Sequence, residues 1–471
     1  MEIFFMKLTM ENLEVKDIQF ADTTHFSDGT LFVSKDEMFD HVKDEPLLKE
    51  LEINIVRPGD SARVIEVLDA IEPRCKVGDT YDNWPGHLSE SFKTAGEGVT
   101  RALKGMSMLT CNFVPSRIMR NGITLDMKGE YADFSPYSKL LNLVVEVKLT
   151  DDDVLKDAVR AAAKANYQPG EEVLESFSKV DSIPTEERFE AIKRIKLKLS
   201  TFLAQQTLDV AADSVEVFDN ETRYPNLPRV AYSLQLVTEQ YNCDGYSESM
   251  FYGYPIQDNL PWIVEPTEVL DGSIAQCSYG RYMLTYEIQN AAVIVDLLRE
   301  HGKTVDFVGM IITTVSSEAK RRNITSQMVG NIMKETFKVD GALFTKCMGG
   351  APTICMGLAA SACEDRGIHT VEIQDAFNPI NNMNSELIFD DVRVGKVNHS
   401  LSFGNAAVGP RLVMDKIYGG IPETPMWDVA NGGFITYTKD LPNSAKSPVL
   451  IGTVLGAIAY LGGFNMRAVE Y

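Results

Sequence analysis

Residues 291–315, AAVIVDLLREHGKTVDFVGMIITTV, are the most informative part of the sequence about the fold. Its first half has the composition of a helix and ends at Gly302, a residue well suited to a left-handed helix cap. Its second half, Val305 to Val315, is an almost unbroken apolar run, which is typical of a parallel strand buried on both faces. These residues therefore predict a helix that leads into an interior strand of an α/β sheet.

The same alternation continues toward the C-terminus. The further predicted elements are helices at Ser317–Phe337 and Ala351–Glu364 and strands at Gly341–Thr345 and Ile368–Ile373. Strands that alternate with helices in this way predict a doubly wound α/β domain with right-handed crossovers, which we assign to residues 268–471.

The N-terminal part has a different pattern. Residues 1–150 are predicted to form a β-rich domain, because Leu51–Val56 alternates apolar and polar residues and further strand-like runs follow at Met106–Phe113 and Leu140–Val147. Residues 151–267 are predicted to be a helical and mixed segment that leads to the loop after residue 268. The fold class is therefore α/β overall, with a β-rich domain followed by a doubly wound α/β domain.

One predicted helix in the middle segment carries a run of basic residues. Pro184 and the acids Glu186 and Glu187 open this helix, and apolar residues recur at spacings of three and four. The basic residues from Lys193 to Lys198 are interpreted as the solvated face of the helix.

Composition excludes several classes of protein. The net charge is −22, from 45 Lys and Arg against 67 Asp and Glu, which argues against a nucleic-acid partner. The start of the chain lacks the basic segment and apolar run of a signal peptide. The apolar run at residues 448–461 is too short to span a bilayer, so we expect a buried helix there, no membrane association and a cytoplasmic location.

The seven cysteines are widely spaced, with no CxxC pair and no Cys/His spacing that suits zinc. This pattern predicts a reducing compartment and no metal site. Cys355 and Cys363 lie in a run of small residues and are interpreted as buried core residues. The turn Gly349–Thr353 has backbone donors that can hold an anion, but neither GxGxxG nor a P-loop is present, so we predict no nucleotide cofactor.

The candidate chemistry lies in residues 268–290, EVLDGSIAQCSYGRYMLTYEIQN, which contain Cys277 and Ser278 in a loop-like setting. A second cysteine, Cys243, follows Asn242 in a Tyr-rich loop where a turn is the simplest interpretation. A thiol becomes a nucleophile where a base lowers its pKa. A Cys or Ser side chain can also attack the carbonyl group before it and, after β-elimination and hydrolysis, leave an N-terminal pyruvoyl group. Two further interpretations of Cys277 are an unprocessed remnant or substrate-pocket residue, and a buried, inert thiol.

Five collinear stretches resemble the α subunit of component B of the glycine, sarcosine and betaine reductases of amino-acid-fermenting anaerobes. They are residues 56–74 (VRPGDSARVIEVLDAIEPR), 130–145 (EYADFSPYSKLLNLVV), 265–274 (EPTEVLDGSI), 289–313 (QNAAVIVDLLREHGKTVDFVGMIIT) and 463–471 (GFNMRAVEY). Similarity therefore runs over nearly the whole chain.

The resemblance implies a proprotein that cuts itself at an Asn–Cys bond soon after the Leu-Asp-Gly turn and so makes a pyruvoyl group. That group would hold a small amine or amino acid as a Schiff base while its C–N bond is reductively cleaved. The resemblance also implies three partners: a β subunit with a selenocysteine or cysteine, a small selenoprotein carrier and an acyl-forming component. In this chain, Gln276 stands before Cys277 where the family has Asn.

By this resemblance we expect the catalytic group to derive from Cys277, with Gln276 across the scissile bond and Ser278 beside it. Cys243, preceded by Asn242, is the second candidate. The expected substrate-binding residues are Tyr282, Tyr286, Gln289 and Asn290.

The expected function is that of an oxidoreductase subunit, an amino-acid or amine reductase with a disulfide-linked acceptor. The alternative is an uncut homologue without a pyruvoyl group, which acts as partner or scaffold subunit of a thiol or selenol reductase. A stand-alone pyruvoyl decarboxylase is a third option, and the breadth of the resemblance argues against it.

Overall fold

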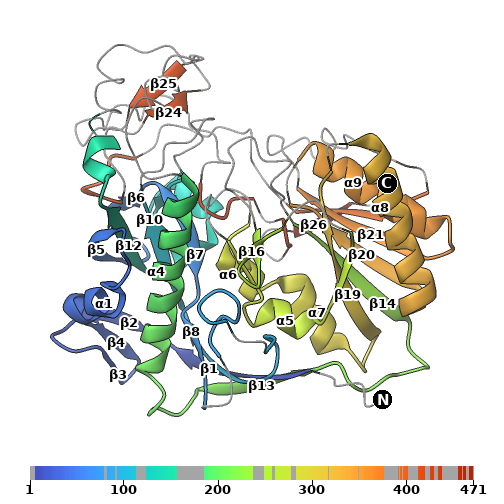
Figure 1. Cartoon of the computed structure of the whole chain (residues 1–471), viewed down its shortest axis with the longest axis horizontal. Coiled ribbons are helices and arrows are strands. Elements are labelled where there is room, and N and C mark those ends of the chain that lie inside the picture. Colours follow the sequence, from blue (N-terminus) through green and yellow to red (C-terminus); the bar gives the residue numbers. More distant parts are fainter. Residues whose placement is uncertain are drawn as a thin grey trace.

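The computed structural model describes most of the 471 residues. These are residues 6–78, 82–90, 93–112, 123–155, 157, 185–236, 249–256, 260–276, 283–316, 318–347, 349–375, 391, 393–394, 396–400, 412–419, 425–428, 433–436, 454–458, 460–462 and 466–469. They form an N-terminal β-rich lobe and a C-terminal α/β lobe, with the short helices α5 and α6 between them (Figure 1).

The N-terminal lobe is framed by two four-stranded sheets, in the orders β13-β1-β9-β8 and β5-β12-β10-β7. The strands of these sheets are β1 (Lys7–Glu14), β5 (Leu48–Val56), β7 (Val67–Ile71), β8 (Arg74–Lys76), β9 (Gly98–Lys104), β10 (Met106–Cys111), β12 (Leu141–Leu149) and β13 (Ser214–Asp219). The predicted β-rich character of this region is confirmed.

Smaller elements complete this lobe. They are β2 (Asp17–Phe20), β3 (His25–Ser27), β4 (Thr30–Val33), β6 (Ala62–Val64), β11 (Leu125–Asp126) and β23 (Lys416–Tyr418), with helix α1 (Lys35–Val42) and the 3₁₀ turns Glu130–Phe134 and Pro136–Lys139. Helix α4 (Thr185–Gln205) buries Ile192, Ile195 and Leu199 in the same core as Leu103 and Leu143 of the sheets. Apolar spacing along α4 thus fixes one of its faces against the sheets.

The C-terminal lobe is a seven-stranded sheet in the order β17-β19-β14-β20-β21-β22-β26. Strands β14, β19, β20, β21 and β22 run parallel, whereas β17 and β26 are antiparallel to their neighbours. The strands are β14 (Arg229–Leu236), β17 (Trp262–Val264), β19 (Asp306–Thr314), β20 (Gly341–Thr345), β21 (His369–Asp375), β22 (Lys396–Ser400) and β26 (Met466–Val469).

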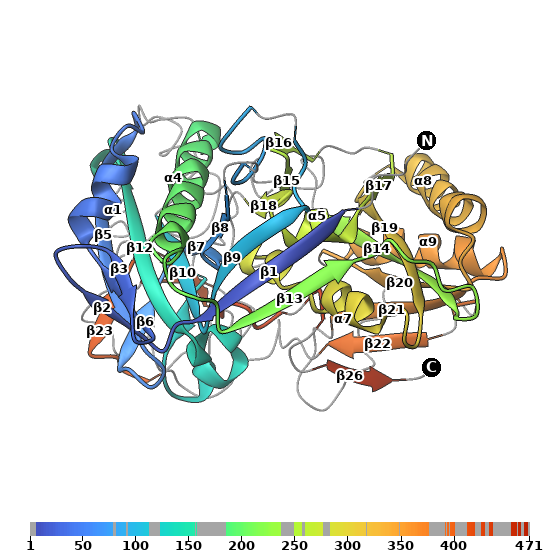
Figure 2. The same cartoon turned by 90° about the horizontal axis from the view of Figure 1, so that it is seen from below.

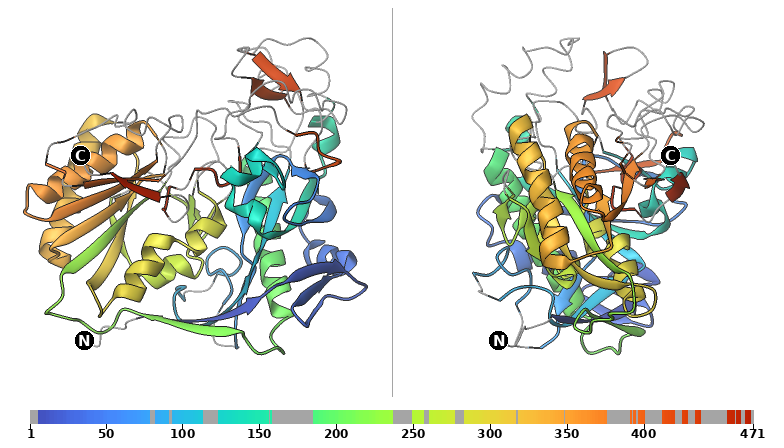
Figure 3. Two further views of the ribbon diagram at one scale, coloured as in Figure 1. Left: turned by 180° about the vertical axis from the view of Figure 1, so that it is seen from behind. Right: turned by 90° about the vertical axis from the view of Figure 1, so that its right-hand side faces the viewer.

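Helices cover both faces of this sheet (Figure 3). On the face toward the N-terminal lobe, Val293 and Ile294 of α7 (Ala292–Glu300) share a core with Met310 and Ile312 of β19. On the outer face lie α8 (Ala319–Asn331), its π-helical extension Ile332–Phe337, and α9 (Ala351–Glu364), packed on Phe344. Strand order reverses at β14, so this half is doubly wound, and the predicted α/β class is confirmed.

Long strands connect the lobes. Strand β1 pairs with β13 on one side and β9 on the other, and this ribbon runs below both lobes (Figure 2). The seven-stranded sheet also takes β14 and β17 from the segment before residue 268, so its first strands precede the predicted domain start. Between the lobes lie β15 (Ser249–Phe251), β16 (Tyr254–Pro255), β18 (Ile274–Gln276), α5 (Pro266–Leu270) and α6 (Thr285–Gln289).

The C-terminal region departs from one expectation. The helix predicted over residues 448–461 is wrong for its described part, because Val454 forms a β-bridge with Thr124 and turns follow. Strands β24 (Pro425–Asp428) and β25 (Gly433–Thr436) form a separate hairpin. Among the helices described, none combines the length and the apolar character needed to cross a bilayer. The predicted cytoplasmic location stays a prediction.

Candidate functional site between the lobes

The segment that leads to Gln276 is held tightly by its own local structure. Helix α5 has a proline, Pro266, at its first turn, and Glu265 and Glu268 cap it reciprocally. Gly272 has a φ of 100°, and a Cβ there would lie 2.9 Å from the ring of Trp84, so glycine is needed for both reasons. The chain then enters β18, which pairs with β15 and ends at Gln276.

Side chains from two other elements hold the backbone of Gln276 on both sides. Its carbonyl oxygen accepts a hydrogen bond of 2.6 Å from Nζ of Lys196, and its N–H donates to Oγ1 of Thr285 at 3.0 Å. The carboxylate of Asp69 accepts from Lys196 at 2.5 Å and from the N–H and hydroxyl of Thr285 at 2.8 and 2.5 Å. The side chains of Lys196 and Asp69 are each 1% exposed. The buried ammonium group of Lys196 therefore donates a hydrogen bond to the peptide carbonyl immediately before Cys277.

This contact has a chemical consequence. A preorganised, buried donor stabilises negative charge on a carbonyl oxygen far more than a water molecule does, because the low-dielectric surroundings screen the charge weakly. Attack on the carbonyl carbon of Gln276 would generate such a charge, and Lys196 lies at the position where it would develop.

The interpretation of the Lys193–Lys198 run as a solvated face is wrong for two of its lysines. Lys193 and Lys196 are both 2% exposed, and Lys193 pairs with Glu190 at 2.6 Å. Lys198 does reach the surface, where it pairs with an exposed aspartate. Buried lysines persist only when a partner neutralises them, and here those partners include Asp69 of strand β7, which helical spacing does not reveal.

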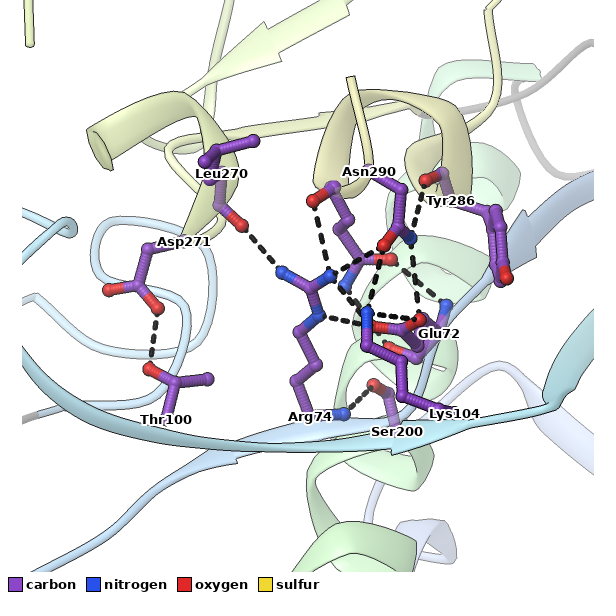
Figure 4. Close-up of polar contacts among 10 residues, drawn as sticks. Glu72, Arg74, Thr100, Lys104, Ser200, Leu270, Asp271, Tyr286 and Asn290 are labelled. Carbon is purple, nitrogen blue, oxygen red and sulfur yellow. Dashed lines mark hydrogen bonds and ion pairs between the residues drawn. The ribbon is translucent and has the colours of Figure 1, made fainter. Parts of the chain in front are cut away.

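A second buried cluster lies below α5 and α6, centred on Arg74 (Figure 4). Its guanidinium donates to the carboxylate of Glu72 at 2.7 Å and to the backbone carbonyls of Leu270 and Gln289 at 2.6 and 3.1 Å. The side-chain amide of Gln289 in turn donates to the carbonyl of Glu72 at 3.1 Å. One arginine from strand β8 thus ties the ends of both interlobe helices to the N-terminal lobe.

Lys104 completes the cluster. Its ammonium donates to the carboxylate of Glu72 and to Oδ1 of Asn290, each at 3.0 Å. Burial alone would raise the pKa of Glu72, but the Arg74 and Lys104 charges hold that pKa below its ordinary value. Burial lowers the pKa of Lys104. Arg74, Lys104 and Asn290 of this cluster line a charged cavity of about 310 Å³. Its other charged and polar lining residues include Asn12, Glu216 and Arg299.

A separate, mostly apolar cavity of about 240 Å³ lies beside α6. Its lining includes Tyr137, Tyr286, Glu287 and Asn290. The two tyrosine rings stand nearly perpendicular, with centroids 5.4 Å apart. Tyr137 is 1% exposed, and its hydroxyl finds no hydrogen-bond partner among the described residues. Burial raises the pKa of Glu287 to about 8.

The structure brings together four of the residues predicted for the site. Gln276 lies in the Lys196 network, Gln289 and Asn290 contact the Arg74 cluster, and Tyr286 lines the apolar cavity. The remaining predicted residues lie outside the described part of the chain: they are Cys277, Ser278, Tyr282, Asn242 and Cys243. Their assigned roles stay predictions.

Several residues of the site were missed by the sequence analysis, most clearly Asp69, Glu72, Arg74 and Lys196. Asp69 lies in strand β7, whose other residues are buried and apolar, and Glu72 and Arg74 follow that strand closely in the sequence. A charge inside an apolar strand is rarely buried without a partner, and that signal alone marks this region as unusual. His87 is also buried near this segment: its Nε2 lies 3.2 Å from the carbonyl oxygen of Ser273, and burial lowers its pKa to about 3.

The fold and site define an α/β protein whose two lobes enclose a buried, charge-rich junction, and comparison with known sequences identifies its family. The family model of glycine/sarcosine/betaine reductase component B subunits matches residues 6–441, and this chain belongs to that family. No solved structure matches the chain.

Curated relatives align over most of their length. The glycine reductase complex component B subunits alpha and beta of Acetoanaerobium sticklandii are 30% identical over 99% of this chain and 100% of the relative. The sarcosine reductase complex component B subunit alpha of Peptoclostridium acidaminophilum is 29% identical over 79% of this chain and 80% of the relative. The betaine reductase counterpart from the same organism is also 29% identical, over 85% of each chain. These are components of reductase complexes, so this chain has a reductase-related role with partner subunits.

Proposed function

We propose that this chain takes part in reductive cleavage of the C–N bond of a small amine or amino acid, after cutting itself between Gln276 and Cys277 to form a pyruvoyl group. Its partners would be a subunit with a reactive selenocysteine or cysteine and a small selenoprotein carrier. Disulfide formation on such a partner would supply the two electrons for the reduction.

The observation that carries this proposal is the 2.6 Å hydrogen bond from Lys196 to the carbonyl oxygen of Gln276. Attack by the Cys277 thiol on that carbonyl carbon gives an oxyanion, which the ammonium stabilises. Loss of the Cys277 amine from that carbon leaves a thioester. β-Elimination then releases Gln276 as a thioacid and leaves dehydroalanine, which takes up water and loses ammonia to become the pyruvoyl group.

The surroundings of Gln276 fit such a group. Asp69 keeps Lys196 and Thr285 in place on either side of the residue, so the carbonyl is oriented before any reaction. A pyruvoyl group supplies a ketone that reacts with amines and withdraws electrons from them. The apolar cavity lined by Tyr286 lies on α6, the helix whose first residue is Thr285, and it offers a place for the amine.

The names of two relatives support the proposal. Each glycine reductase relative is named for alpha and beta subunits together, and this chain aligns with 100% of it. A single chain that yields two peptides is consistent with such a name.

Denaturing electrophoresis and intact-mass measurement test the proposal directly. We expect two peptides that correspond to residues 1–276 and 277–471, with a ketone on the second that borohydride or hydrazine traps. The Cys277→Ala variant should stay whole, and the Cys243→Ala variant should be cut normally. A single 52.3 kDa chain without a trappable ketone would overturn the proposal.

The role of Lys196 needs its own control. We expect Lys196→Gln to slow self-cleavage by about 10²–10³-fold, the usual cost of removing one oxyanion donor. Lys193→Gln is a matched control, because Lys193 is equally buried on the same helix but pairs with Glu190. Circular dichroism must show both variants folded for the comparison to count. Equal self-cleavage rates in the two variants would show that Lys196 does not stabilise the oxyanion.

A second candidate function is an uncut subunit that scaffolds a redox partner. Gln276 favours it, because this residue stands where the resemblance expects Asn and its backbone is fully paired within an intact chain. The experiment above separates the two candidates, since only the first yields two peptides.

A further inference from the structure

We propose that Lys104 is a nucleophilic amine and that the charged cavity it lines binds a small 2-oxo acid, whose ketone group forms an imine with that amine. This is the cavity of about 310 Å³ that Arg74 and Asn290 also line. The reaction needs neither self-cleavage nor a partner subunit, so the inference does not depend on the proposed function.

The position of Lys104 distinguishes it from other lysines that have buried partners. Lys76 and Lys196 are also paired with buried carboxylates, but their side chains are only 6% and 1% exposed. Lys104 lines the cavity with a side chain that is 29% exposed, and the carboxylate of Glu72 that it contacts is fully enclosed (Figure 4). A buried lysine becomes a nucleophile where its surroundings favour the neutral amine. Here burial, and to a lesser extent the charge of Arg74, lower the pKa of Lys104 against the opposing effect of Glu72.

The strand register places a further polar group close to Lys104. Strands β1 and β9 are parallel, with Asn12 opposite Ala102 and Glu14 opposite Lys104. Asn12 therefore lies on the same face of the sheet as Lys104, two positions away, and it lines the same cavity. Its Oδ1 is buried and finds no hydrogen-bond partner among the described residues. A buried acceptor without a partner is uncommon and costs free energy, and a bound ligand that donates to it removes that cost.

The charged groups of the wall favour a small anionic ligand. Among the residues described, the lining has more positive groups than carboxylates: Arg74, Lys104 and Arg299 against Glu216 and Asp296. Two nitrogens of Arg299 bind Glu216, at 2.7 and 2.9 Å, whereas Nη1 lies 4.0 Å from Asp296, beyond hydrogen-bond distance. A carboxylate beside the ketone group of the ligand therefore has a partner in Arg299. The cavity volume is at the lower end of the range for small-molecule sites, so the ligand is small.

The reaction balances without an oxidant or a reductant. The Lys104 ammonium gives one proton to the carboxylate of Glu72, 3.0 Å away, and the freed lone pair forms a bond to the ketone carbon. The ketone oxygen becomes the hydroxyl of a carbinolamine, to which Asn12 offers an acceptor. Glu72 returns its proton to this hydroxyl, water leaves, and a protonated imine remains on Lys104. Because the imine keeps the positive charge, Glu72 has an ion-pair partner in the product as well.

Reductive trapping with sodium cyanoborohydride tests the inference on the full-length chain. Pyruvate is the probe, and butan-2-one is an uncharged ketone of similar size. Hydride adds to the imine carbon and leaves a stable secondary amine, whose position is found by peptide mass spectrometry. Lys43, with a side chain that is 59% exposed, is the internal reference, because it corrects for the different reactivities of the two ketones.

The result is the ratio of adduct on Lys104 to adduct on Lys43. We expect this ratio to be at least about tenfold higher with pyruvate than with butan-2-one, because the cavity holds the 2-oxo acid next to the amine. No pyruvate adduct on Lys104, or a pyruvate ratio below one, would overturn the inference. Equal ratios for the two ketones would overturn the assignment of an anionic ligand.

A variant of the cavity wall locates the site. We expect Arg299→Gln to lower the pyruvate ratio by about 3- to 10-fold and to leave the butan-2-one ratio unchanged, because only the charged ligand loses a partner. Arg393→Gln is the matched control, since Arg393 is an exposed, paired arginine that does not line the cavity. An unchanged pyruvate ratio in Arg299→Gln would contradict the proposed binding of the carboxylate.

The same experiment separates this inference from the proposed self-cleavage. Lys104 precedes Gln276, so its adduct lies on the first peptide, whereas a ketone derived from Cys277 would lie on the second. A cut chain without an adduct on Lys104 would contradict the present inference alone. An uncut chain that carries the adduct would contradict the processing proposal alone.

Discussion

Two helices of this protein, α9 and α4, both pack an apolar face as predicted, but the basic run of α4, predicted to be solvated, is partly buried. Helix α9 covers the outer face of the seven-stranded sheet with small and apolar residues, and its bounds, Ala351–Glu364, match the prediction. Helix α4 buries apolar residues too, but it also buries Lys193 and Lys196. The difference shows that a basic run on a helix does not establish a solvated face.

The physical reason lies in how the two kinds of burial are stabilised. Apolar burial is non-directional and follows composition, so the run of small residues in α9 suffices to predict it. A buried ammonium needs a specific partner, and Asp69, the partner of Lys196, is 127 residues away in the sequence. The junction between the lobes is built from such long-range pairs, whereas the outer face of the sheet is built from apolar contacts.

The largest effect is expected when the buried pair between Lys196 of α4 and Asp69 is broken. We expect Lys196→Met to lower the free energy of unfolding by about 3–5 kcal/mol, because Asp69 is left as an unpaired buried charge. Urea denaturation followed by circular dichroism measures the change. Lys198→Met is the matched control: its pair with Asp44 is partly exposed, so we expect a loss of about 0–1 kcal/mol. Similar losses in the two variants would mean that burial does not make the Lys196 pair more important for stability than the partly exposed Lys198 pair.

The second prediction concerns how the stability of the folded chain depends on pH through Glu287 of helix α6. Burial raises the pKa of Glu287 from 4.5 to about 8, so between these values the folded chain keeps a proton that the unfolded chain has lost. The contribution of this proton to the free energy of unfolding is therefore complete below pH 4.5. It falls as the pH rises toward 8, by up to about 1.4 kcal/mol per pH unit. Denaturant midpoints between pH 5 and 8 measure this slope. Glu287→Gln should flatten it, and an unchanged slope in that variant would assign the effect to another group.

A smaller effect is expected in the apolar face of α9. Cys363 is fully buried among apolar side chains, and burial raises the pKa of its thiol to about 12. We expect Cys363→Ser to cost about 1–3 kcal/mol, because a hydroxyl there must be buried without a strong partner. Thermal and urea unfolding should show Cys363→Ser to be less stable than Cys363→Ala. The opposite ranking would indicate that this side of α9 holds polar contacts, as α4 does.

The smallest effect is expected at a surface pair between the lobes. Arg299 of α7 and Glu216 of β13 form a partly exposed pair with contacts of 2.7 and 2.9 Å. We expect Arg299→Ala to change stability by less than about 1 kcal/mol, and the change to shrink in high salt. Unfolding at low and high salt measures it. A large loss that salt does not reduce would show that this surface pair behaves as the buried ones do.

The α/β lobe and the family of this protein could be predicted from the amino-acid pattern. Strand β20 and helix α9 lie at their predicted bounds, and β19 and α7 agree within a residue or two at each end, because apolar periodicity and glycine caps act locally. Cys355 and Cys363 are buried as predicted. The candidate loop was also found from sequence, since the stretches on either side of it carry the family resemblance.

The residues that surround that loop could not be predicted in the same way. Asp69, Lys196 and Thr285 come from three separate regions of the chain, and nothing in their local patterns indicates that they meet at Gln276. The same holds for Tyr137 and Tyr286, which form one corner of a cavity although 149 positions separate them. Local propensity specifies helices and strands, whereas the partner of a buried charge or ring depends on how the lobes pack, and packing is a property of the whole chain.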